Sequence, residues 1–368
     1  MAHENLTLLT PGPLTTSPLV RKAMERDWGS RDSAFVNLTS ELRFMLAGLA
    51  NGTDTHVAVP IGGPGTSAVE AAIGTLVGPT DRLLVLVNGA YGERVVEIAR
   101  RLRIPVEIIR GPEDRPIDTD HVEAALRNNP EITHVALVHC ETTTGVLNPL
   151  EEIACIVERF GRLLILDAMS SFGALPIDVT ISPIAALVAS SNKCLESVPG
   201  VGFVVVERTL IANAASVSPS LSLDLHAQWA AFEATGQWRF TPPVQVVAAL
   251  VEALHQLKQE GGPPARLNRY QRNMNLLLAG MQKLGFVSLL ARAVHAPIIA
   301  TFLTPSDKTF VFRTFYESLL SRGFLIYPGK TTAVDSFRVG CIGAIDHHVM
   351  ERFLTAVSEA KMAKKNFF

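Results

Sequence analysis

The chain has 368 residues, with 33 Lys and Arg against 35 Asp and Glu, so its formal net charge at pH 7 is only -2. This length allows two or more domains and a large core, and the balanced charge gives no support for a nucleic-acid-binding or membrane-surface protein. Hydrophobic residues make up 48% of the chain but occur in short runs, none as long as a membrane-spanning helix, so we expect a soluble protein.

The N-terminus and the cysteines indicate a cytoplasmic protein. The opening residues MAHENLTLLT have neither the basic start nor the long apolar run of a secretion signal. Wide spacing without a CxxC pair favours reduced thiols and argues against a zinc site. The four cysteines are Cys140, Cys155, Cys194 and Cys341.

The first predicted helix begins at Ser17 and Pro18, an N-cap and first-turn pair, and runs to about Trp28. The preceding stretch LLTPGPLTT is interrupted by proline and glycine, so it cannot be regular structure. It is either a plain linker or the border of a pocket, to which hydroxyls such as that of Thr15 would contribute. Arg31 lies in the polar stretch after the helix and is either a surface charge or a group that reaches an anionic substrate.

A glycine-rich turn at residues 62–67 follows the strand predicted for His56–Ile61 and leads into a helical pattern. Such a turn exposes backbone amides at the positive end of a helix dipole, and Thr66 and Ser67 add hydroxyl donors. The turn is a phosphate site in outline, although helices in general need entry loops. It lacks the Walker lysine and the dinucleotide spacing, which lowers the odds of ATP or NAD.

Strands and helices then alternate as far as residue 138, which predicts a mostly parallel sheet covered on both faces. Tyr91 follows one strand and is either a stacking group for a flat ring or a core residue. Thr142 and Thr143 belong to a polar cluster after another strand, where ligands are expected. The predicted segments are strands at Leu83–Val87, Pro105–Ile109 and His134–Val138 and helices at Tyr91–Leu102 and Thr119–Asn128.

Two short apolar runs end in polar or charged residues. The run at 163–166 precedes Asp167, and the run at 184–189 precedes a cluster that contains Asn192 and Lys193. Each residue alone has an ordinary explanation, because an Asp after a strand often caps a helix and a Lys there is usually solvated. Together they suit pyridoxal phosphate, which needs a Schiff-base lysine and an anion beside its pyridinium nitrogen.

The C-terminal part changes character after a strand at Phe203–Val206 that would close the sheet. The segment Ser216–Phe240 reads as irregular, and two long helices follow, the first from Val244 to Gln259 and the second ending at Leu284. We therefore expect a division near residue 250, with a large domain at 1–250 and a smaller α+β domain at 251–368.

Nine ordered segments resemble the fold-type I pyridoxal phosphate enzymes of the class V aminotransferase group, and most of all those acting on 2-aminoethylphosphonate and pyruvate. The resemblance implies an α/β fold whose large domain holds a mostly parallel seven-stranded sheet, and a homodimer with active sites at its interface. The chain departs from the family pattern at residues 63–67 and 195–197. The segments are LLTPGPLTTS, VNGAYGER, VHCETTTGVLNP, LDAMSSFGALPID, SSNKC followed by VPG, SLSLDL, WRFT, IYPGK and FRVGCIGAI.

The resemblance also implies roles. Lys193 would form the Schiff base and shuttle the proton, and Asp167 would keep the pyridine nitrogen protonated. Arg338 would bind the acidic group of either substrate through its two-pronged guanidinium, with Thr15 and Arg31 adding donors for a phosphonate. The remaining cofactor contacts would come from Gly65, Thr66, Ser67, Tyr91, Thr142, Thr143, Asn192 and, across the dimer interface, Thr241.

The expected reaction moves the amino group of 2-aminoethylphosphonate to pyruvate, giving phosphonoacetaldehyde and L-alanine. Two related activities stay open: a lyase acting on a hydroxylated aminoethylphosphonate and an alanine–glyoxylate type aminotransferase. A cysteine desulfurase is disfavoured, because it needs a mobile thiol and Cys341 is expected to be buried. A DNA-binding regulator would carry a basic appendage that the sequence lacks.

Overall fold

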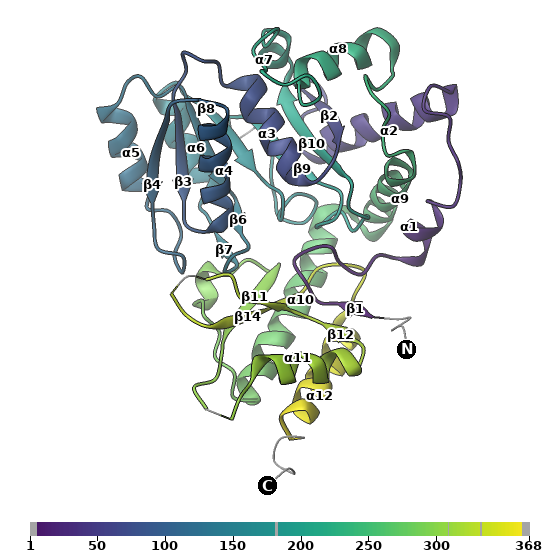
Figure 1. The fold of residues 1–368 in the computed structure, drawn as a ribbon, viewed down its shortest axis with the longest axis vertical. Coiled ribbons are helices and arrows are strands. Elements are labelled where there is room, and N and C mark those ends of the chain that lie inside the picture. The colour runs from purple at the N-terminus through teal and green to yellow at the C-terminus, as the bar shows by residue number, and fades with distance from the viewer. Residues whose placement is uncertain (1–5, 181–182, 308, 332, 363–368) are drawn as a thin grey trace.

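The computed structural model describes residues 6–180, 183–307, 309–331 and 333–362. A seven-stranded sheet forms its centre (Figure 1). Strand β10 is antiparallel to both of its neighbours, whereas the other adjacent strands are parallel, which confirms the expected mostly parallel α/β sheet. In spatial order the strands are β2 (His56–Gly62), β10 (Val201–Glu207), β9 (Ile184–Ser190), β8 (Leu163–Asp167), β5 (His134–Val138), β3 (Leu83–Val87) and β4 (Val106–Arg110).

The central strands are continuous apolar runs because helices cover the sheet and leave both strand faces buried. Every residue of β3, β5 and β9 is buried. The helices and short elements associated with this part are α2 (Ser33–Leu49), α3 (Gly65–Leu76), α4 (Ala90–Arg101), α5 (Thr119–Asn128), α6 (Leu150–Arg159), α7 (Arg208–Ala212), α8 (Leu225–Thr235), α9 (Val244–Glu260), β6 (Cys140–Glu141) and β7 (Val146–Leu147).

The C-terminal residues form a smaller region, drawn in green and yellow, to which α10 leads from the sheet (Figure 1). Its core gathers phenylalanine rings, among them Phe286, Phe302 and Phe337. The N-terminal strand β1 joins this region by pairing in parallel with β12. The elements are β1 (Thr7–Leu8), α1 (Pro18–Lys22), α10 (Gly262–Lys283), η1 (Arg292–Val294), β11 (Ile299–Leu303), α11 (Phe312–Ser321), β12 (Phe324–Leu325), β13 (Tyr327–Pro328), β14 (Ser336–Gly340) and α12 (His347–Met362).

Two sequence predictions of local structure are wrong. Helix α1 ends at Lys22 rather than near Trp28. The segment expected to be irregular contains α8, whose N-terminus is capped by Asp224 and whose Phe232 packs edge-on against Trp238. Leu225 and Phe232 also pack into the core of the large sheet, and Leu225 N donates to Thr75 Oγ1 on α3, so α8 has a buried face that its own sequence does not predict.

The division at residue 250 remains a prediction. Helix α9 crosses that position, and Leu254 and Leu257 at its end pack into the core of the large sheet. In the described part of the chain, no helix has both the length and the apolar character needed to cross a membrane.

Candidate active site

A cavity of about 200 Å³ opens at the carboxyl ends of β5, β8 and β9, next to the N-termini of α3 and α4. Ligands of open α/β sheets bind at this edge. The lining residues include seven of those singled out from the sequence: Gly65, Thr66, Tyr91, Thr142, Asp167, Asn192 and Lys193. The structure therefore brings together groups from five separate stretches of the chain.

Lys193 follows β9 and turns its side chain toward the N-terminal segment. Its Nζ atom donates to the backbone oxygen of Pro11 at 2.6 Å and lies 3.5 Å from that of Gly12. Burial lowers the pKa of Lys193 and outweighs the opposing effect of nearby Tyr91, Cys194 and Asp167. A lowered pKa increases the fraction of neutral amine, which is the form that attacks a carbonyl carbon.

Asp167 is the last residue of β8. Its Oδ1 accepts a hydrogen bond of 2.9 Å from the backbone nitrogen of Met169. Burial raises the pKa of Asp167 to about 6, although that hydrogen bond and the nearby Lys193 oppose the rise. A cationic group bound next to this carboxylate would be stabilised by it and would in turn favour the ionised form of Asp167.

The N-terminus of α3 supplies hydrogen-bond donors and positive charge, in contrast to the carboxylate of Asp167. Pro64 at its N-cap makes no side-chain cap, so the first amides of the helix are available to an anion. A Cβ atom at position 65 would lie 2.2 Å from Met169 Sδ, so a larger residue there would displace the end of the Met169 side chain. Thr66 Oγ1 accepts a 3.1 Å hydrogen bond from Arg94, which adds a positive charge to this end of the cavity.

Tyr91 lies in the first turn of α4, and cations surround its ring. The guanidinium carbon of Arg94 is 4.8 Å from the ring centroid and Lys330 Nζ is 5.1 Å from it. Burial by itself would raise the pKa of Tyr91, but Lys193 and Lys330 reverse that effect and lower it. The phenol is therefore held in a strongly positive environment.

Arg338 lies on β14, in the C-terminal region, and approaches Tyr91 from there. The residue is only 3% exposed. It donates to the backbone oxygen of Thr142 at 2.9 Å and to that of Pro328 at 3.1 Å, and its guanidinium lies beside the Tyr91 hydroxyl. Burial lowers the pKa of Arg338. Arg338 is thus fixed beside Thr142 and Tyr91, two residues of the cavity lining, although Arg338 itself is not part of that lining.

Comparison with known proteins identifies the family. The family model described as aminotransferase class-V matches residues 23–316. The chain belongs to the class V aminotransferases. It is 52% identical over 352 residues to the 2-aminoethylphosphonate–pyruvate transaminase of Pseudomonas entomophila, covering 96% of each chain, and 52% identical over 353 residues to 2-aminoethylphosphonate–pyruvate transaminase 1 of Cupriavidus pinatubonensis, covering 96% of this chain and 93% of the relative.

Solved structures agree with this membership. Pyridoxamine-pyruvate aminotransferase from Mesorhizobium loti matches with a TM-score of 0.90 at 25% identity, covering 100% of this chain and 94% of the other. Alanine–glyoxylate aminotransferase from Nostoc sp. also gives a TM-score of 0.90, at 26% identity, with 97% of this chain and 95% of the other covered. The whole chain therefore has the fold of fold-type I aminotransferases, as expected from the sequence.

The side chains of Thr142 and Thr143 have different surroundings in this class V aminotransferase. Thr142 lines the cavity, whereas the Thr143 hydroxyl accepts from Ala90 N at 2.9 Å and donates to Glu141 at 2.6 Å. Glu141 in turn accepts from the amides of Tyr91 and Gly92, so the two side chains together cap α4. The resemblance implied cofactor contacts from both threonines; the hydrogen bonds place the Thr143 hydroxyl in the cap, and its contact with a cofactor remains a prediction.

Apart from Thr143 and Arg338, four predicted site residues are absent from the cavity lining in this single chain. The hydroxyl of Thr15 accepts from Leu8 N at 2.8 Å, and Thr15 lines a separate depression near α1. Arg31 and Thr241 are exposed. Ser67 is absent from the cavity lining and packs against Gly63. Direct contact of these residues with a cofactor or substrate remains a prediction.

Sequence reasoning missed several residues of the aminotransferase cavity. Arg94 could have been found, because it lies one helical turn after Tyr91 and shares its face. Met169 and Ser190 carry no comparable signal, since they reach the cavity only through the register of β8 and β9.

Cys341 is fully buried with its Sγ 3.9 Å from Met274 Sδ, and burial raises its pKa well above the usual range, as expected for an inert thiol.

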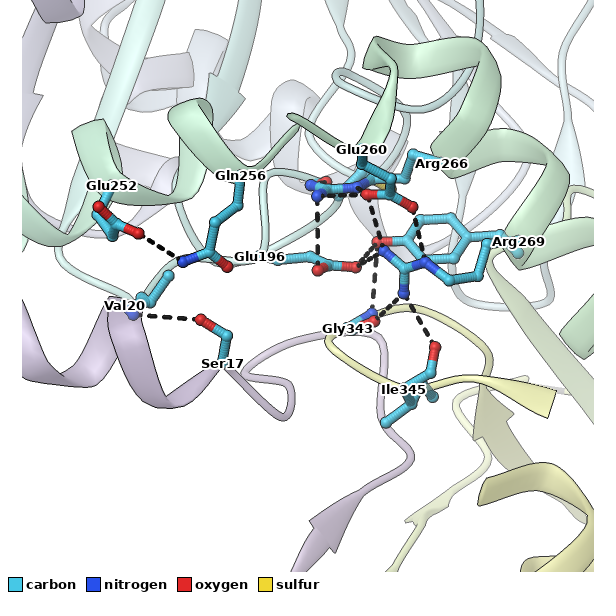
Figure 2. Close-up of polar contacts among 12 residues, drawn as sticks. Ser17, Val20, Glu196, Glu252, Gln256, Glu260, Arg266, Arg269, Gly343 and Ile345 are labelled. Atoms are coloured by element: carbon cyan, nitrogen blue, oxygen red, sulfur yellow. Dashed lines mark hydrogen bonds and ion pairs between the residues drawn. The ribbon is translucent and has the colours of Figure 1, made fainter. Parts of the chain in front are cut away.

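A second polar cluster surrounds Glu196, three residues after Lys193 at the turn that follows β9 (Figure 2). Glu196, with a left-handed φ of 61°, accepts from Arg269 at 2.8 Å and from the hydroxyl of Tyr270. Arg269 also donates to the backbone oxygens of Gly343 and Ile345, at 2.6 and 2.9 Å. The cluster therefore ties the turn that carries the lysine to α10 and to the loop before α12.

The same cluster contains a second carboxylate. Glu260 accepts from Arg266 at 2.9 Å and from Arg269 at 2.8 Å, so two carboxylates face two guanidinium groups. Despite burial, these ion pairs raise the pKa of both arginines. The departure from the family pattern at Glu196 thus belongs to a charge network outside the cavity lining, and not to the N-terminus of α3.

Proposed function

We propose that this class V aminotransferase transfers the amino group of 2-aminoethylphosphonate to pyruvate, producing phosphonoacetaldehyde and L-alanine. The name shared by relatives 51–52% identical over 96% of the chain supports this substrate pair. One observation carries the aminotransferase chemistry: a buried lysine amine and a buried carboxylate face the same cavity at the carboxyl ends of neighbouring strands.

We propose pyridoxal 5'-phosphate as the cofactor, because the cavity offers each type of group that it needs. Lys193 would hold its aldehyde carbon, Asp167 would pair with its ring nitrogen, and Tyr91 would stack on its ring. The amides of Gly65 and Thr66, with Asn192, would receive its phosphate. When bound, the cofactor supplies an electron sink for the carbon that loses and gains a proton.

The residues of the chain would carry the remaining steps. The neutral amine of Lys193 would take the proton from the substrate carbon and return it to the cofactor's former aldehyde carbon. Arg338 would bind the acidic group of each substrate in turn, since its fork fits both a carboxylate and a phosphonate. Its burial among backbone carbonyls would keep the fork in one orientation.

We also propose a homodimer. Large apolar side chains are exposed on α1, on α2 and around α8, namely Leu19 at 57%, Phe44 at 70%, Leu221 at 72% and Phe240 at 49%. Exposed apolar residues of this size indicate a covered surface. Thr241 directly follows Phe240, so a partner seated on this surface could receive its hydroxyl. A sedimentation mass of one chain at working concentration would contradict the dimer.

The compartment is proposed from the thiols. The structure leaves all four cysteines free, three of them buried. Free thiols persist in reducing compartments, which supports a cytoplasmic enzyme.

A half-reaction assay tests the proposed function. The purified holoenzyme should be yellow, and borohydride should fix the cofactor on Lys193. Mixing with 2-aminoethylphosphonate or with L-alanine should bleach the visible band, and pyruvate should then yield alanine in the phosphonate reaction. Ammonia release without alanine would indicate the lyase, and faster turnover with glyoxylate than with pyruvate would indicate the alanine–glyoxylate activity. Equal bleaching by β-alanine would refute the selectivity for phosphonate.

A further inference from the structure

Two cations meet at the hydroxyl of Tyr91, a residue of the cavity lining, although neither cation is itself part of that lining. Lys330 Nζ donates to this hydroxyl at 3.4 Å, and the guanidinium of Arg338 lies beside it. Lys330 comes from the short loop that follows β13, whereas Arg338 is on β14, the strand that pairs with β13. The loop and the strand therefore bring two positive charges to one place.

Neither cation has a carboxylate partner among the described residues. Arg338 donates to the carbonyl oxygens of Thr142 and Pro328, and Lys330 to the Tyr91 hydroxyl. The nearby acid Glu141 is already occupied by the N-terminal amides of α4. The surroundings of the Tyr91 hydroxyl, at the border of the cavity, consequently carry excess positive charge, which attracts and orients anionic ligands.

The excess charge suits a dianion better than a monoanion. A phosphonate presents three acceptor oxygens and up to two negative charges, whereas a carboxylate presents two oxygens and one charge. A guanidinium fork binds two oxygens side by side, and an ammonium group supplies a point charge for a third. We propose that Lys330 is the specificity-determining residue of the substrate site, binding the phosphonate together with Arg338 and contributing little to carboxylate binding.

Residues expected to supply these additional donors do not face the cavity in this chain. The hydroxyl of Thr15 accepts from Leu8 N, and Arg31 is exposed on the loop before α2. Lys330 is also exposed, but its amine reaches the Tyr91 hydroxyl directly. The inference rests on the proposed function and identifies which side chain of the same site selects the phosphonate.

The test uses holoenzyme variants that should fold normally. Lys330→Met removes the charge and keeps the length, Lys330→Arg keeps the charge, and Lys283→Met removes an exposed lysine from α10 as a matched control. Apparent dissociation constants come from the concentration dependence of bleaching by 2-aminoethylphosphonate and by L-alanine. Lys330→Met should weaken binding of the phosphonate about tenfold or more, and that of alanine less than about threefold.

The control variants complete the expected pattern. Lys330→Arg should retain most of the phosphonate affinity, and Lys283→Met should bind both amines as the parent enzyme does. An equal loss for both amines in Lys330→Met, or no loss for the phosphonate, would overturn the role of Lys330.

Inhibition of the alanine reaction tests the role of Lys330 separately from the proposal that 2-aminoethylphosphonate is the substrate. If the parent enzyme is bleached by alanine and not by 2-aminoethylphosphonate, the proposed function is wrong. Ethylphosphonate and propionate then serve as inhibitors of the alanine reaction. A preference for ethylphosphonate that falls about tenfold in Lys330→Met supports the assignment of Lys330. An unchanged ratio, or no preference in the parent enzyme, overturns it.

Discussion

The two sides of the turn at Lys193–Glu196 hold buried charges in contrasting ways. On the cavity side, Lys193 and Arg338 donate only to neutral oxygens, and Asp167 accepts from a backbone amide. Behind the turn, Glu196 and Glu260 are paired with Arg266 and Arg269 at distances down to 2.8 Å.

The shifted pKa values report this difference. Burial lowers the pKa of Lys193 and raises that of Asp167, so the folded chain disfavours both charged forms. In the cluster behind the turn, the ion pairs overcome burial, lowering the pKa of Glu260 and raising that of Arg266. Unpaired buried charges are costly and mark ligand sites, whereas paired ones fix local structure. Around this turn, the buried charges without an ion-pair partner therefore lie at the cavity, and the paired ones hold the turn in place.

Lys193→Ala gives the largest contrast between activity and stability. Turnover should fall on the order of 10⁴-fold or more, because both the covalent link and the proton carrier are lost. The apo-protein should unfold at the same denaturant concentration as the parent or at a higher one, since no ion pair is broken. Steady-state rates and urea unfolding measure the two effects. A clear loss of apo-protein stability would show that Lys193 is also a structural residue.

Glu196→Ala should have the reverse profile. It leaves Arg269 and the buried Arg266 short of a partner, which should cost about 3–5 kcal/mol of unfolding free energy. Glu233→Ala is the matched control, because Glu233 pairs with Arg43 while 43% exposed, and it should cost less than about 1 kcal/mol. Denaturant unfolding compares the two variants. Similar costs for both would mean that the cluster behind the turn adds no special stability.

Asp167 contributes a distinct part of the pH dependence of apo-protein stability. Its folded-state pKa of about 6 exceeds the ordinary value of 3.8, so between these limits the folded chain holds a proton that the unfolded chain has lost. Stability from this residue is therefore greatest below pH 4 and declines as pH rises to 6, by about 3 kcal/mol in total. Asp167→Asn should remove that decline while reducing turnover. An identical pH profile of stability in both proteins would contradict the raised pKa.

The sequence predicted the parts of the site that depend on local pattern. Asp167 and Lys193 end apolar runs, and parallel strands bring such ends to one edge, so their proximity followed from the fold class. The cap formed by Glu141 and the cluster around Glu196 could not be predicted in this way. Glu196 meets Arg269 and Tyr270 only after α10 packs behind the turn, and no periodicity within either segment encodes that contact.

The pairing of β1 with β12 has a consequence for the order of synthesis. Thr7 pairs with Phe324, and the segment after β1 brings the Pro11 carbonyl to Lys193. The ribosome synthesises β1 long before β12. During this time β1 has no strand to pair with, while the central sheet can already assemble. Contacts between such distant positions also slow folding. A nascent chain stalled before β12 should thus hold a folded sheet in which Lys193 still lacks the Pro11 carbonyl as its partner.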